Sequence, residues 1–270
     1  MVTARMVADA IESVAPLSIG LPSEKLGFVY GNPDRPISGV TVCWAPTLRI
    51  LKESAAADRR LVICHEPLFF PAFSESFPEG QTPWYRDLPT CEKPPNRHRR
   101  AVLDREQLAV YWAHSNWDFA PGLGVTDSFV KLIGLDKELR RGPYTRVYQI
   151  SPTPLKDLAR FVKARLGLDQ VRVMGAPDRP VQRVGLVLGG FGQVFTSSEA
   201  AALQGADVVI FGEALDYTLR CAHEYGMAAI ETTHLATEAP GLRAMSDWLA
   251  KRFVQLDVFY ADSGQLFSYL

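Results

Sequence analysis

Short apolar runs alternate with helical patterns along most of this chain. Brief runs rich in branched or aromatic residues, which are typical of buried strands, occur at 27–30, 39–44, 61–64, 108–112, 144–150, 171–174, 184–188, 208–211, 227–230 and 254–260. Apolar residues with a helical period predict helices at 2–14, 47–57, 96–108, 126–133, 154–166, 197–204, 214–225 and 241–252, with Thr47 as an N-cap. A strand, a helix and a strand in succession predict a crossover between parallel strands. We therefore expect an α/β protein.

The order of these elements divides the chain into two halves. The second half loosely repeats the first, and residues 140–143 are the expected boundary, which predicts an N-terminal lobe at 1–140 and a C-terminal lobe at 141–270. The proline-rich stretch 71–95 shows no period. Loops of this length are usually functional or mobile, so we expect a flap over a site or an oligomer contact, with plain disorder as the alternative.

Three strand-like runs end in polar groups that can bind a metal ion. His65 and Glu66 follow the run 61–64, and Pro67 then stops the strand because it has no N–H to donate. The other two runs lead to His114 with Asp118 and to His234 with Glu238. A spacing of four residues places both side chains on one face of a helix. Imidazole and carboxylate together suit first-row divalent ions, so convergence of these strand ends would form a metal site.

Each of these residues also has a purely structural interpretation. His65 could cap its strand, and the other two histidines could be hydrogen-bonded core groups. Asp118 and Glu238 could be acidic residues that interact with helix N-termini. A joint metal role is favoured because three separate segments of the chain offer the same kinds of residue.

The glycines of Gly189-Gly-Phe-Gly192 follow a strand and invite comparison with a dinucleotide-binding loop. The match fails because Phe195 stands where the third glycine belongs. One interpretation is a tight turn that needs positive φ. The other is that backbone N–H groups at Gly190 and Gly192 bind an anionic group of a substrate.

Composition excludes several classes of partner. Among 270 residues, 29 Lys and Arg balance 30 Asp and Glu, so the net charge of -1 provides no electrostatic footprint for nucleic acid or an anionic membrane. The four cysteines form no C-x-x-C pair. Charges at Arg5, Asp9 and Glu12 interrupt the first helix, unlike a signal peptide, and no apolar run is long enough to span a bilayer. We expect a cytoplasmic protein with a small-molecule substrate.

Several motifs in order resemble one family. They are HEPLFF, AVYWAHSNWDFAPGLGVTDSFVKLIGL, VGLVLGGFGQVF, GADVVIFGEALDYTLRCAHEYGMAAIE and THLATE. From about Leu17 to about Phe253, the chain resembles the GTP cyclohydrolase 1 type 2 homologues, also called Nif-three-like proteins.

The resemblance implies two similar, intertwined α/β lobes with mixed sheets and a dinuclear metal centre in the cleft between them. By position, the metal ligands would be His65, Glu66, Asp118, His234 and Glu238, with Glu238 bridging two ions of Mn, Fe, Zn or Mg. His114 would lie beside them as a proton-transfer group. The resemblance also implies a homo-oligomer, which in this family is often a hexameric ring.

The chain departs from the family pattern at four places. Glu66 replaces a second histidine, which shifts the metal preference toward oxygen-loving ions such as Mn or Mg. Tyr217 replaces a histidine and Ala45 an aspartate, and residues 23–28 replace a Trp-Asp-Asn-x-Gly-Leu stretch.

The leading hypothesis is a metal-dependent, GTP cyclohydrolase-like hydrolase that acts on a small nucleotide-like or heterocyclic substrate. Two alternatives remain open: a metal-binding scaffold or regulatory protein without turnover, and an inactive relative of the family.

Overall fold

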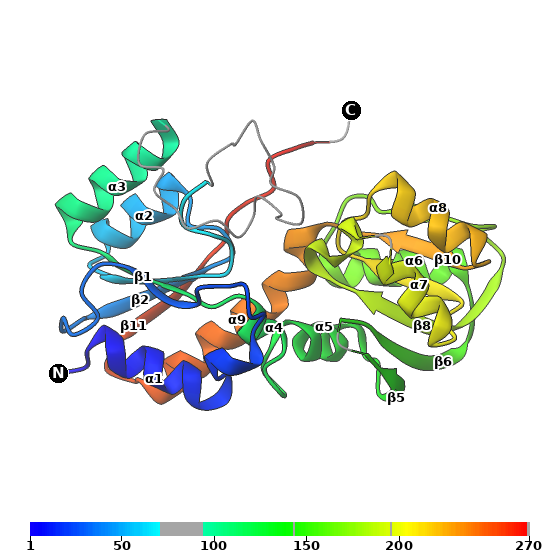
Figure 1. Cartoon of the computed structure of the whole chain (residues 1–270), viewed down its shortest axis with the longest axis horizontal. Helices are drawn as coiled ribbons and strands as arrows, with labels where there is room; N and C mark the ends of the chain where they lie inside the picture. Colours follow the sequence, from blue (N-terminus) through cyan, green and yellow to red (C-terminus); the bar gives the residue numbers. More distant parts are fainter. Residues whose placement is uncertain (71–93, 143, 195, 269–270) are drawn as a thin grey trace. The chain divides into compact units, whose positions relative to one another are not determined.

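The computed structural model describes residues 1–70, 94–142, 144–194 and 196–268. The chain forms two compact units (Figure 1). The first unit contains Met1–Gly124 and Gly241–Leu270, and the second contains Val125–Pro240. The flap predicted at 71–95 lies outside the described residues except for its last two positions. Within the described ranges, no helix is long and apolar enough to cross a membrane.

The first unit is built on a five-stranded sheet in the order β1-β4-β3-β2-β11. The strands are β1 (Gly27–Tyr30), β4 (Ala109–Trp112), β3 (Leu61–Cys64), β2 (Gly39–Cys43) and β11 (Asp257–Ala261). All neighbouring strands are parallel except β1 and β4. The parallel pairing of β2 with β3 confirms the predicted crossover.

Helices cover both faces of this sheet. The helices of the first unit are α1 (Ala4–Val14), η1 (Leu17–Ile19), α2 (Leu48–Ala56), α3 (Pro94–Glu106), α4 (Ser115–Asp118) and the C-terminal part of α9 (His234–Arg252). The helices α2 and α3 enclose an apolar core on one face, and α1 and α9 lie on the opposite face (Figure 1). Thr47 caps α2 as expected, because its side chain accepts a hydrogen bond from the N–H of Ile50.

The second unit is built on a six-stranded mixed sheet in the order β5-β6-β8-β9-β10-β7. Its strands are β5 (Lys137–Arg141), β6 (Arg146–Pro154), β8 (Pro180–Val187), β9 (Val208–Phe211), β10 (Ala228–Glu231) and β7 (Arg172–Met174). Among the described strands of this sheet, the neighbouring pairs β8–β9 and β9–β10 are parallel, and the other neighbouring pairs are antiparallel. The accompanying helices are α5 (Val125–Ile133), α6 (Leu155–Leu166), η3 (Gly189–Gln193), α7 (Thr196–Leu203) and α8 (Asp216–Glu224).

The α/β class with two mixed sheets is confirmed, but the division of the chain differs from the predicted lobes at 1–140 and 141–270. Strand β11 pairs with β2 over five residues, which returns the C-terminal segment to the first unit. Strand β5 begins before the predicted boundary at 140–143, yet it pairs with β6 and belongs to the second sheet. Pairing between distant strands, rather than order along the chain, therefore defines the units.

Candidate metal-binding residues

The candidate residues of the first unit stand at the carboxyl ends of parallel strands. His65 and Glu66 follow β3, and their backbone N–H groups donate to the carbonyl oxygen of Trp44 at 3.0 and 2.7 Å. His114 follows β4 and precedes the short helix α4, which ends at Asp118. In open α/β sheets, this edge is where ligands usually bind.

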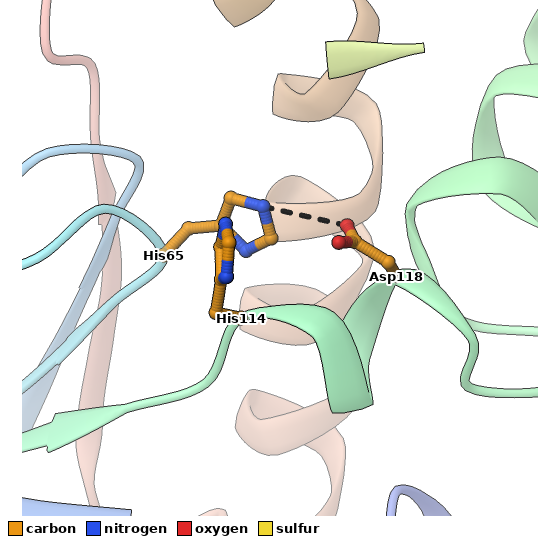
Figure 2. Close-up of side chains that lie close together, drawn as sticks. All are labelled: His65, His114 and Asp118. Atoms are coloured by element: carbon orange, nitrogen blue, oxygen red, sulfur yellow. Dashed lines mark ion pairs between the residues drawn. The ribbon is translucent and has the colours of Figure 1, made fainter. Parts of the chain in front are cut away.

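The side chains of His65 and Asp118 face each other (Figure 2). His65 is fully buried, and its Nδ1 lies 3.0 Å from the carbonyl oxygen of Ala113. A carbonyl oxygen only accepts hydrogen bonds, so Nδ1 carries the proton and the neutral ring keeps its lone pair on Nε2. That Nε2 lies 3.4 Å from Oδ1 of Asp118, which is also buried. A cation between these atoms, either a proton or a metal ion, would interact with both the nitrogen and the oxygen. Metal-binding histidines have the same arrangement, in which the other ring nitrogen donates a hydrogen bond to an oxygen.

The imidazole of His114 completes this group. Its ring centroid lies 4.7 Å from that of His65, and it stacks on Trp112 at 5.6 Å. One ligand atom from each of His65, His114 and Asp118 lies within 4.8 Å of the others. The first unit alone therefore offers two imidazoles and one carboxylate, a donor set that fits a first-row divalent ion.

A carboxylate that the sequence analysis missed lies behind His114. Oε1 of Glu24 is 2.7 Å from Nδ1 of His114. Burial alone would lower the pKa of His114, but the hydrogen bond to Glu24 and the charges of Asp118 and Glu24 raise it overall. Burial would raise the pKa of Glu24, but hydrogen bonds from His114 and Ser115 lower it overall. Both shifts favour an ionic hydrogen bond between the two side chains.

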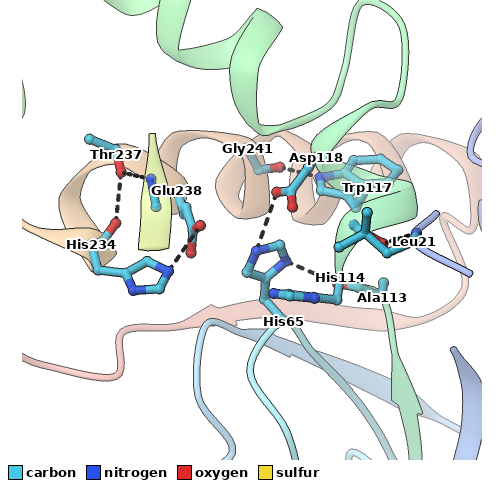
Figure 3. A network of polar contacts seen from close by, with 12 residues as sticks. Leu21, His65, Ala113, His114, Trp117, Asp118, His234, Thr237, Glu238 and Gly241 are labelled. Carbon is cyan, nitrogen blue, oxygen red and sulfur yellow. Dashed lines mark hydrogen bonds and ion pairs between the residues drawn. The ribbon is translucent and has the colours of Figure 1, made fainter. Parts of the chain in front are cut away.

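In the second unit, His234 and Glu238 stand one turn apart at the start of α9 (Figure 3). Nε2 of His234 lies 3.1 Å from Oε1 of Glu238, which confirms that the spacing of four residues brings the side chains together. Nδ1 of His234 lies 3.4 Å from Oε1 of Glu213, which follows β9. The ring of His234 lowers the pKa of Glu213 through a hydrogen bond, although burial opposes this shift. His234 is thus flanked by two carboxylates.

The glycine turn lies against the same two residues of α9. Gly189 has φ +57°, and a Cβ there would collide with Oε1 of Glu238. Its N–H donates to Oγ1 of Thr237 at 3.0 Å, and that hydroxyl donates to the carbonyl oxygen of His234 at 2.8 Å (Figure 3). A residue other than glycine at position 189 would strain the backbone and displace the carboxylate.

The predicted substrate-binding glycines lie in the same turn. A Cβ at Gly190 would stand 3.1 Å from Cε1 of His234, so this residue lies beside the imidazole. A Cβ at Gly192 would collide with the carbonyl oxygen of Glu213, so a packing constraint already explains this glycine. The positive φ predicted for the turn occurs at Gly189 and at neither of these two positions.

Sequence signals existed for both missed carboxylates. Glu24 stands at the aspartate position of the Trp-Asp-Asn-x-Gly-Leu stretch that residues 23–28 replace. Glu213 follows the run 208–211 after one glycine, so it too stands at a strand end. Two of the other substituted positions offer no buried ligand, because Ala45 has only a methyl group and Tyr217 is 78% exposed.

Comparisons with known proteins agree with this architecture. A Salmonella typhimurium protein named GTP cyclohydrolase 1 type 2 homolog is 30% identical over 227 residues, which cover 84% of this chain and 83% of the relative. The crystal structure of a Bacillus cereus protein related to NIF3 matches with a TM-score of 0.81 at 15% identity, covering 100% of this chain and 99% of that one. A Staphylococcus aureus structure matches with a TM-score of 0.80 at 16% identity over 100% and 99% of the two chains.

The two structural matches show a shared fold. The model of the Duf34/NIF3 (NGG1p interacting factor 3) family matches residues 2–264 of the chain. This protein therefore belongs to the Duf34/NIF3 family.

Proposed function

We propose that the chain is a metal-dependent hydrolase. The observation that carries this proposal is the pair of His65 Nε2 and Asp118 Oδ1, 3.4 Å apart and buried, with the proton of His65 held at Nδ1 by a carbonyl oxygen. Two donors that bind one ion at ~2.0–2.1 Å in tetrahedral geometry stand about 3.4 Å apart, so this spacing suits a shared metal ion.

By the family resemblance, five residues would hold two divalent ions. They are His65, Glu66 and Asp118 from the first unit and His234 and Glu238 from the second, and Glu238 would be shared by both ions. The three carboxylates among them favour Mn or Mg over softer ions. Fe and Zn remain in the candidate set because both histidines are good ligands for them.

Residues of the chain would provide proton transfer and substrate binding. Bound divalent ions would supply a hydroxide at neutral pH, because coordination lowers the pKa of water from ~15.7 toward ~7. His114 takes or gives the proton, and it does so through Nε2 because Nδ1 is engaged by Glu24. Backbone N–H groups of the turn at Gly190 and Gly192 bind an anionic group of the substrate.

The substrate in this proposal is a small nucleotide-like or heterocyclic compound. Support comes from the name of the Salmonella typhimurium relative, GTP cyclohydrolase 1 type 2 homolog. The near-zero net charge of the chain also suits a small substrate better than nucleic acid. We further propose a homo-oligomer on the basis of the family resemblance, which light scattering on purified protein tests directly.

Metal analysis followed by hydrolysis assays tests the function. The purified protein is loaded with Mn, its metal content is measured, and turnover of a panel of nucleotides is followed. Two equivalents of metal with turnover that is lost in Asp118→Asn support the hydrolase. Asp127→Asn is the matched control, because Asp127 pairs with Arg146 and is none of the proposed ligands. Stoichiometric metal without turnover of any panel member would favour a metal-binding scaffold, and absence of metal would favour an inactive relative.

A further inference from the structure

The carboxylate of Glu24 is buried beneath His114 and contacts both this residue and Ser115, the first residue of α4. Its side chain is 1% exposed. Oε1 lies 2.7 Å from Nδ1 of His114. Oε2 accepts hydrogen bonds from the hydroxyl of Ser115 and, at 3.4 Å, from the backbone N–H of the same residue. Both carboxylate oxygens are therefore directed at the imidazole and its neighbour.

These contacts determine which nitrogen of His114 carries the proton. An ionised carboxylate only accepts hydrogen bonds, so Nδ1 must donate. In the neutral ring, Nε2 then holds the only lone pair of the imidazole. A short hydrogen bond to a buried charged group is also stronger than one between neutral groups.

The ring plane of His114 is held from a second side. Trp112 stacks on it with an angle of 19° between the planes. Trp112 is itself anchored, because its Nε1 donates to the carbonyl oxygen of His65 at 2.7 Å. A flip that presented Nδ1 to His65 and Asp118 would break the bond to Glu24, so the ring keeps one orientation.

We infer that Glu24 is a positioning residue that holds His114 in the Nδ1–H tautomer, so that Nε2 is the nitrogen available for chemistry. The inference rests on the proposed function, in which His114 transfers a proton, and it assigns that transfer to one atom. It also makes the two imidazoles of the first unit alike: an oxygen holds Nδ1 of each, Ala113 for His65 and Glu24 for His114.

Nitrogen NMR on the full-length, metal-free protein tests this inference. Histidine is labelled with ¹⁵N, and the side-chain resonances are correlated at alkaline pH, where the neutral ring is observed. We expect His114 to show a protonated Nδ1 and an unprotonated Nε2. Glu24→Ala should shift the ring toward the Nε2–H form that predominates in free histidine. Glu24→Gln retains a carbonyl acceptor at this position and should restore much of the Nδ1–H form.

Glu12→Gln is the matched control. Glu12 is another carboxylate of the first unit, and it accepts a hydrogen bond from the hydroxyl of Tyr111 at 2.9 Å without contacting the imidazoles. Its replacement should leave the His114 signals unchanged. An Nε2–H tautomer in the wild-type protein overturns the inference, as does a Glu24→Ala spectrum identical to wild type. The wild-type spectrum alone shows which tautomer His114 adopts, so it tests the inference even if the Glu24→Ala variant does not fold.

The experiment also separates this inference from the hydrolase proposal. It uses neither metal nor substrate, so loss of the hydrolase function would leave a wild-type Nδ1–H result intact. Conversely, metal uptake and turnover with an Nε2–H tautomer at His114 would support the hydrolase and remove the role of Glu24.

Discussion

At the scale of single residues, Asp118 is the acid whose removal is the most direct test of metal binding. Asparagine keeps the shape of the side chain but loses the charge that faces Nε2 of His65 at 3.4 Å. Loss of a residue that hydrogen-bonds to a metal ligand typically lowers metal affinity ~10–100-fold. We expect Asp118→Asn, which alters a ligand itself, to weaken Mn or Zn binding by at least about 100-fold, as measured by competition with a chelator. Unchanged affinity with an intact fold would exclude Asp118 as a ligand.

Gly189 provides a second prediction at this scale. Gly189→Ala introduces a Cβ into a backbone with φ +57°, where it would collide with Oε1 of Glu238. The left-handed backbone alone costs ~1–2 kcal/mol. We expect a loss of stability larger than this, together with weaker metal binding, because the carboxylate must move.

Gly167→Ala is the control for Gly189→Ala. Gly167 also has positive φ, at the C-cap of α6, but a Cβ there would meet nothing within 4 Å. This variant should show the backbone cost alone, measured by urea unfolding, and should bind metal normally. Equal effects of the two substitutions on stability and metal binding would contradict the collision argument.

Sequence reasoning at this scale found most of the acids and imidazoles at strand ends. It missed Glu24 and Glu213, which contact the imidazoles of His114 and His234. His65, Asp118 and His234 follow strand-like runs, which is a local signal. Glu24 lies 90 residues before His114. Its sequence signal is its place in the family stretch that residues 23–28 replace, whereas local periodicity and spacing do not connect it with His114.

At the scale of elements, α9 shows how an N-cap can determine where a site begins. The apolar periodicity predicted a helix at 241–252, yet α9 starts at His234 and includes Pro240. Pro240 is the seventh residue of the helix, and it has no N–H to donate to the carbonyl oxygen of Ala236. The hydroxyl of Thr233 accepts a hydrogen bond from the N–H of Ala236 at 3.1 Å. This cap fixes the turn that carries His234 and Glu238.

Removal of this cap should affect both stability and the candidate ligands. We expect Thr233→Ala to lower the free energy of unfolding by ~1 kcal/mol and to weaken metal binding, while Thr233→Ser should retain both. Thr47→Ala removes the equivalent cap of α2 and should cost a similar amount without changing metal affinity. Urea unfolding and chelator competition measure the two quantities. If Thr47→Ala weakened metal binding as much as Thr233→Ala, the local argument would fail.

Most helices and strands were predictable because each has its own periodicity. The exceptions are informative. Strand β5 reads Lys-Glu-Leu-Arg-Arg and has no apolar alternation beyond Leu139, because it is an edge strand with exposed charges. Its backbone pairing with β6, together with the hydrogen bond from the hydroxyl of Tyr148 in β6 to Glu138 at 3.0 Å, holds it extended in place of hydrophobic burial. Such a strand has no signal in the hydrophobic pattern.

At the scale of the whole molecule, the chain leaves the first unit at Gly124 and returns to it at Gly241. The lobes predicted at 1–140 and 141–270 followed the order of elements, and nothing in residues 257–261 identifies β2 as their partner. Pairing of β11 with β2 joins residues more than two hundred positions apart, Asp257 with Gly39 and Ala261 with Cys43. Long-range pairing of this kind carries no local sequence pattern.

The last prediction follows from that pairing. All five residues of β2 are buried, and β11 covers its outer edge. A chain that ends at Leu256 would expose this edge, and an exposed apolar edge strand promotes association with other chains. We expect this truncation to lower the melting temperature of the first unit and to form large species in size-exclusion chromatography. A chain that ends at Gly264 keeps β11 and the bond from Ala45 N–H to the Ser263 hydroxyl at 2.9 Å, so it should behave as wild type. Wild-type stability in both truncations would mean that the C-terminal strand adds nothing to the first unit.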